Sequence, residues 1–211
     1  MNLVIIKDII NRISSEDLLL CFFVSCITSY KINYLLVITE IIKERGVKSD
    51  KIYETILQSY LFCGFPVTIE SMKIFNKVYK SFRKPKYDFN LSKYRISGVK
   101  NCQKIYKSNF NKLMDNFAVL SKELKEWMII EGYGKVMGRK GLSLKTRELI
   151  NTAILATKYF EHQLYSHIKG SLNTGSTYEE ILNVIKVTEF FGGKKNVDKS
   201  LMLLDKIKAL V

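Results

Sequence analysis

Residues 131–181, EGYGKVMGRKGLSLKTRELINTAILATKYFEHQLYSHIKGSLNTGSTYEEI, carry the clearest structural signal in the sequence. Glycines at positions 132, 134 and 138 predict a bend. Ser143 after the bend is a typical helix N-cap, so we expect a helix to begin there. A second reversal is expected at Gly175, where a Ser-Thr pair and two glutamates supply the cap and the acidic first turn of another helix.

The same order of features occurs earlier in the chain. Two segments of about sixty residues align without a gap at an offset of 129 positions, the separation of Gly64 from Gly193. The matched identities include Ser14 with Ser143, Leu20 with Leu149, Tyr30 with Tyr159 and Gly46 with Gly175. Each unit reads as helix, turn, helix, glycine stop and helix. The sequence therefore predicts an all-α fold made by tandem duplication of a helical repeat.

Composition supports a helical globular protein. The chain has 211 residues, 47% of them hydrophobic, and its 2 prolines and 11 glycines are too few for a turn-dense β-sandwich. The net charge of +14 would favour an anionic partner, but the basic residues are scattered, with local density only at Lys80–Lys86 and Gly193–Lys195. We therefore expect no specific nucleic-acid binding, and biased composition alone explains the charge.

The cysteines and the N-terminus indicate a cytoplasmic protein. Cys21, Cys26, Cys63 and Cys102 include no C-x2-C pair, which predicts buried free thiols in a reducing compartment and no metal site. The apolar stretch at residues 18–28 is too short to cross a membrane and lacks a cleavage site. No targeting segment and no membrane partner are expected.

Three segments are expected along the chain. Residues 1–79 form a degenerate N-terminal repeat, residues 80–96 a basic, proline-containing linker, and residues 97–211 the C-terminal repeat with its preceding helices. Apolar spacing predicts those preceding helices at about 97–117 and 122–130.

The C-terminal repeat resembles the carboxymuconolactone decarboxylase family. The matching pieces are Tyr133-Gly134 before RKGL, the REL helix at 147–149, and H-x2-G-x2-N-x-G-x-T-x-E-E-I from His167 to Ile181. The resemblance is strong over residues 97–205 and faint in the first repeat. It implies an all-α fold that oligomerises through its repeats, so a two-repeat chain would form a homotrimer, with a homodimer as the alternative.

One branch of this superfamily, similar to alkylhydroperoxidase D, uses the pattern E-x11-C-x2-C-x3-H. Counting from Glu148, the two cysteine positions hold Phe160 and Gln163, and the histidine position holds His167. Thiol peroxidase chemistry needs an attacking thiolate and a resolving cysteine. This activity is therefore not expected.

The decarboxylase branch works without a metal or an organic cofactor, so none is expected here. Such chemistry needs a cation for an acid substrate, a donor for the developing enolate, and a proton donor for the carbon that loses carbon dioxide. The resemblance implies the catalytic candidates Glu148, His167 and Tyr133, and the substrate-binding candidates Arg139, Arg147 and His162.

Each candidate also has a purely structural interpretation. His162 and His167 are five positions apart, about 140° around a helix, so both are not expected in one pocket unless it wraps the helix. His162 is then an exposed surface residue, and His167 a structural histidine bonded near Gly170. Glu148 would complement the helix dipole. Arg147 would pair with a carboxylate across an interface, and Tyr133 and Trp127 would be core aromatics.

At the same offset, Arg147, Glu148 and His167 correspond to Leu18, Leu19 and Ile38, so the first repeat is expected to serve as scaffold and interface. We interpret the chain as a cofactor-free, decarboxylase-like enzyme acting on a small organic acid or lactone by acid-base chemistry. The alternatives are a non-catalytic oligomeric scaffold or ligand-binding protein of the same fold, and a binder of acidic partners.

Overall fold

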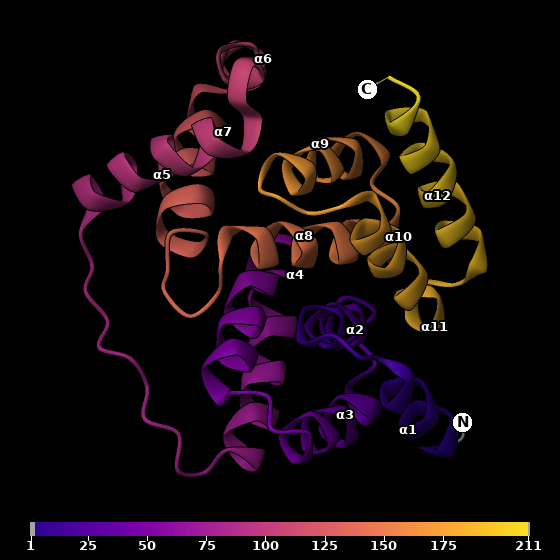
Figure 1. Cartoon of the computed structure of the whole chain (residues 1–211). Coiled ribbons are helices and arrows are strands. Elements are labelled where there is room, and N and C mark those ends of the chain that lie inside the picture. Colours follow the sequence, from indigo (N-terminus) through magenta and orange to yellow (C-terminus); the bar gives the residue numbers. More distant parts are fainter. Residues whose placement is uncertain (1–2, 211) are drawn as a thin grey trace.

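The computed structural model describes residues 3–210, which form helices and, within that range, no strand (Figure 1). The all-α prediction is confirmed. The N-terminal part contains α1 (Leu3–Arg12), α2 (Glu16–Thr28), α3 (Ile32–Glu44) and α4 (Ser49–Val78). The middle contains α5 (Leu91–Tyr106), the short 3-10 helix η1 (Lys107–Asn109), α6 (Phe110–Leu120), α7 (Lys122–Trp127) and the π-helix η2 (Met128–Val136). The C-terminal part contains α8 (Leu144–Lys158), α9 (Glu161–Asn173), α10 (Tyr178–Val187), α11 (Glu189–Gly192) and α12 (Lys194–Lys208).

Helix boundaries in the two halves correspond at the offset of 129 positions. When 129 is added to its residue numbers, α3 has the same bounds as α9. In the same way, the first residue of α4 corresponds to the first residue of α10. Left-handed backbone recurs at Tyr30 (φ 51°) and Tyr159 (φ 54°). It recurs again at Gly64 (φ 72°), which kinks α4, and at Gly193 (φ 83°), which ends α11. These are the similarities that a duplicated unit is expected to show.

The two halves share one core, centred on α2 and α8. All residues from 19 to 28 in α2 and from 146 to 157 in α8 are buried, because both helices are covered on every side. Apolar side chains of both halves form a single cluster, which includes Cys21 and Cys26. A 2.8 Å hydrogen bond between the hydroxyls of Ser25 and Thr157 joins the two helices inside it. Of the four cysteines predicted to be buried free thiols, Cys21, Cys26 and Cys102 are buried, whereas Cys63 is only half-buried.

A second, smaller cluster forms where η2 packs on α5. The predicted bend at Gly132 and Gly134 is wrong, since both glycines lie inside η2. A Cβ on Gly134 would lie 2.1 Å from the Tyr94 carbonyl oxygen, and one on Gly98 would lie 2.0 Å from that of Ile129. These glycines therefore allow close approach of two helices and do not end one.

The linker is shorter than the predicted range. Residues 79–90 carry no helix and run along one side of the molecule, whereas α5 begins at Leu91, inside the expected segment 80–96 (Figure 1). The single helix expected at 97–117 is also wrong, because helical geometry is interrupted at Lys107 (φ 46°) between α5 and α6.

None of the described helices is long and apolar enough to cross a membrane.

Candidate functional site

A histidine and a glutamate meet between α8 and α9. The His167 Nδ1 lies 2.9 Å from Oε2 of Glu148, whose side chain is fully buried. Gly170, one turn after His167, faces the same carboxylate, and a Cβ there would lie 2.4 Å from Oε2. The glycine thus allows α9 to approach α8 closely enough for the pair to form.

The hydrogen bonds around Glu148 fix the direction of this contact. An ionised carboxylate only accepts hydrogen bonds, so Nδ1 of His167 carries the proton and donates. The amide of Asn151 donates to the other oxygen, Oε1 of Glu148, at 3.2 Å. Since Nδ1 is engaged by Glu148, Nε2 is the ring nitrogen left for a ligand.

A buried network extends from Asn151 to α4 of the first repeat. Gln58 donates to Oδ1 of Asn151 and to the backbone carbonyl of Arg147, both at 2.7 Å. The Arg147 guanidinium in turn donates to Oε1 of Gln58 at 3.0 Å and to Oε2 of Glu54 at 2.9 Å. Helix α4 therefore supplies polar partners that position the start of α8.

Arg139 and Arg147 are held by the same carboxylate. Arg139 forms a bidentate pair with Glu54, with contacts of 2.8 to 3.0 Å. Arg147 is 0% exposed, and burial lowers its pKa although Glu54 opposes the change. The bond to Glu54 raises the pKa of Arg139. Arg139 also lines a separate pocket beside residues 83–88 of the linker. The structure thus does not bring either arginine to His167.

His167 opens onto a pocket of about 540 Å³. Its wall is mainly apolar and comes from α4 to α9 and η2, with Phe62, Phe117, Trp127 and Met128 among the lining residues. The Phe62 ring packs edge-on against the His167 imidazole, with the ring centroids 6.0 Å apart. A volume of this size is typical of a small-molecule site.

Two tyrosines close one side of this pocket. The hydroxyls of Tyr133 on η2 and Tyr106 on α5 lie 2.8 Å apart and both residues line the cavity. Burial raises the pKa of each phenol, with the Glu148 charge adding to the effect. Both phenols therefore remain protonated at neutral pH and act as hydrogen-bond donors.

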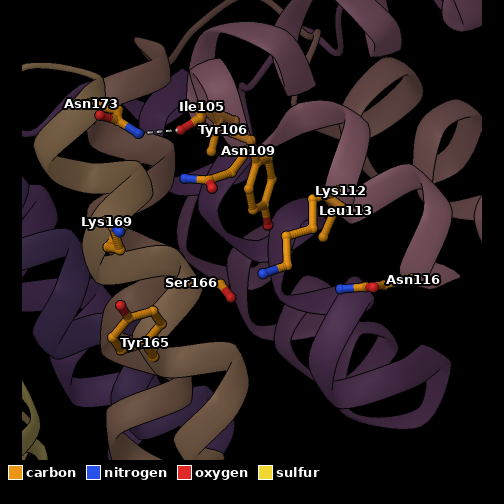
Figure 2. Close-up of a pocket in the computed structure, with 10 residues that line it drawn as sticks. All are labelled: Ile105, Tyr106, Asn109, Lys112, Leu113, Asn116, Tyr165, Ser166, Lys169 and Asn173. Atoms are coloured by element: carbon orange, nitrogen blue, oxygen red, sulfur yellow. Dashed lines mark hydrogen bonds between the residues drawn. The ribbon is translucent and has the colours of Figure 1, made fainter.

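A second pocket of about 310 Å³ adjoins the first, between α9 and the segment from α5 to α6 (Figure 2). Tyr106, Leu113 and Ser166 line both pockets. Amide and ammonium groups account for five of its lining side chains, and the Asn173 amide donates to the Ile105 carbonyl at 2.7 Å.

The structure thus brings Tyr133, His162 and His167 to one pocket, with Glu148 directly behind His167. His162 is exposed but still lines the cavity, because the pocket extends along α9. Trp127 is 63% exposed, so its interpretation as a core aromatic is wrong. The expected partner of Arg147 exists, but it is Glu54 of the same chain.

Sequence reasoning missed four residues of this site: Glu54, Gln58, Tyr106 and Asn151. A signal was present, because Glu54 and Gln58 are spaced i, i+4 and alternate with the apolar residues Ile52 and Ile56 of one helix. Their partners on α8 could not be inferred from that spacing, since they are 89 and 93 positions away in the sequence.

The part of the chain that the structure describes contains no group of three or more His, Cys, Asp or Glu side chains that could hold a metal ion. At the two positions where the peroxidase pattern has cysteines, Phe160 is 54% exposed and Gln163 lines the apolar pocket.

Comparison with protein families gives a match at residues 123–206, to the Carboxymuconolactone decarboxylase family. Comparison with curated proteins gives no match. The matched segment includes Tyr133, Glu148 and His167, whereas Tyr106 and the α4 residues Glu54, Gln58 and Phe62 lie outside it. Residues 123–206 of this chain are therefore similar to the carboxymuconolactone decarboxylase family.

Proposed function

We propose that this protein is a cytoplasmic, cofactor-free enzyme that acts on a small organic acid or lactone by acid-base chemistry at His167. The observation that carries the proposal is the 2.9 Å bond from Nδ1 of His167 to Glu148 at the wall of a 540 Å³ pocket. A buried carboxylate that accepts a hydrogen bond from an imidazole fixes the ring orientation and the tautomer.

In a decarboxylation, the substrate carboxylate leaves as carbon dioxide and its bonding electron pair stays on the carbon as an enolate. The protonated His167 then gives the Nε2 proton to that carbon, and the neutral ring keeps the proton on Nδ1, where it is donated to Glu148. Tyr133 donates a hydrogen bond to the developing enolate oxygen, for which its protonated phenol is suited. Arg139 and Arg147 keep the α4 to α8 contact in place and do not touch the substrate.

Turnover of a panel of small carboxylated lactones and organic acids tests this proposal, with carbon dioxide release and product mass as readouts. We expect His167→Ala and Glu148→Gln to lower turnover at least about a hundredfold, the usual contribution of an acid-base group. Glu179→Gln on the exposed first turn of α10 is the matched control and should turn over normally. Ligand binding without any turnover would favour the non-catalytic, ligand-binding alternative.

A homotrimer is the assembly we propose, with a homodimer as the alternative. Large apolar side chains at the surface support self-association, among them Phe65 and Ile69 of α4 at 66% and 49% exposure. Sedimentation equilibrium measures the mass directly, and a monomer at micromolar concentration would contradict this assembly.

A further inference from the structure

The smaller pocket differs in chemistry from the apolar pocket that it adjoins. Five of its lining side chains are ammonium or amide groups, namely Asn109, Lys112, Asn116, Lys169 and Asn173. None of the described residues that line it is acidic. We call this pocket the polar annex.

Two lysines, Lys112 and Lys169, line the polar annex. Figure 2 shows Lys112 extending from α6 into the pocket toward Ser166 of α9. Lys169, on α9 itself, has its Nζ 5.6 Å from the centroid of the Tyr165 ring. Within the described residues 3–210, neither lysine forms an ion pair. Both ammonium groups are therefore available to an anion.

Arg139 and Arg147, in contrast, are not available to bind a substrate anion. Arg139 and Arg147 share the Glu54 carboxylate, and Arg147 has no exposed surface. A substrate anion in the apolar pocket must then find its positive partner elsewhere. The polar annex is continuous with that pocket through Tyr106, Leu113 and Ser166.

We infer that the polar annex binds, through Lys112 and Lys169, a carboxylate that the substrate keeps throughout the reaction, while the apolar body of the substrate and its reacting group lie in the pocket beside His167. This inference rests on the proposed function, because it takes the apolar pocket as the substrate site. Amide groups of Asn109 and Asn116 complete the donor set, and charge-assisted bonds of this kind are stronger than neutral ones.

Two dyes with the same aromatic body test this inference by fluorescence titration. Anilinonaphthalene sulfonate carries an anion in place of the carboxylate, and phenylnaphthylamine carries no charge. We expect the double variant K112Q/K169Q to weaken binding of the sulfonate dye about tenfold, or about 1.4 kcal/mol. Binding of the neutral dye should change less than about twofold, since the apolar pocket is intact.

Competition identifies the carboxylate. Decanoate should displace the neutral dye from the unmodified protein at lower concentration than decanol, and this advantage should vanish in K112Q/K169Q. The matched control K195Q/K206Q removes two exposed lysines of α12, outside both pockets, and should retain the preference for decanoate.

Equal binding of the sulfonate dye by K112Q/K169Q and the unmodified protein would overturn the inference. An equal loss for both dyes would overturn it as well, because it would show a structural effect. Failure of the unmodified protein to bind either dye would also overturn it. None of these results affects the His167→Ala turnover test, whereas normal turnover in His167→Ala would contradict the proposed function and leave the dye preference unchanged.

Discussion

His167 on α9 and Glu148 on α8 are joined by a 2.9 Å hydrogen bond that orients the imidazole, with Nδ1 toward the carboxylate and Nε2 left for the pocket. The bond depends on close helix packing, since Gly170 leaves no space for a Cβ beside the carboxylate. Both the orientation and the packing lead to measurable predictions.

Gly170→Ala is expected to displace Glu148, because the new methyl would lie 2.4 Å from Oε2 and 2.8 Å from Cγ2 of Ile105. Overpacking of this kind costs about 1 to 3 kcal/mol. Urea unfolding measures the loss, and turnover should fall with it. Gly132→Ala is the control, since a Cβ there meets nothing within 4 Å. Equal stability of the two variants would show that Gly170 does not limit the packing of α9.

Glu54→Gln should destabilise the protein by about 3 to 5 kcal/mol, because it leaves the fully buried Arg147 without its counter-charge. Glu126→Gln removes a carboxylate from the exposed pair with Arg95, whose side chains are 42% and 58% exposed, and should cost less than about 1 kcal/mol. Thermal and urea unfolding of both variants provide the comparison. A similar small loss in both would mean that Glu54 does not neutralise Arg147.

Stability should fall at alkaline pH. Burial raises the pKa of the Cys21 thiol and of the Tyr133 phenol well above their ordinary values of 9.0 and 10.0. Above those values the unfolded chain releases protons that the folded protein retains, so stability is complete below about pH 9 and decreases as the pH rises. Each such group contributes up to about 1.4 kcal/mol per pH unit.

Urea unfolding between pH 8.5 and 10.5 measures this slope, and Cys21→Ala should flatten it because one of the titrating groups is gone. A slope identical to that of the unmodified protein would exclude a role for the Cys21 thiol.

Peroxide should consume no thiols above the background rate. All four cysteines have their pKa raised by burial, that of Cys102 to about 12, so little reactive thiolate exists at neutral pH. Thiol titration after exposure to hydrogen peroxide measures the effect, with the unfolded chain as the reactive reference. Rapid loss of two thiols in the folded protein would indicate a peroxidase-type pair after all.

The sequence predicted the helical class and the turns because those depend on local residues. Gly175 takes positive φ where a reversal was expected, and Gly193 takes it where a helix was expected to stop, whereas Gly64, expected to be the same kind of stop, kinks α4. The sequence also identified Glu148 and His167 as candidate site residues, because both fall at defined positions of one family motif. It could not predict that Glu54 would occupy both arginines, because that contact joins α4 to residues 85 and 93 positions away. The bend expected at Gly132 and Gly134 was wrong for a similar reason, since the packing of η2 on α5 is a tertiary contact that the local sequence does not show.

The proposed acid-base chemistry depends on the tautomer of His167. Nitrogen-15 NMR of histidine-labelled protein distinguishes a protonated ring nitrogen from an unprotonated one. Above the pH at which the ring becomes neutral, we predict that His167 carries its proton on Nδ1 and leaves Nε2 unprotonated, and that Glu148→Gln weakens this preference. A neutral His167 protonated on Nε2, unaffected by Glu148→Gln, would contradict the account.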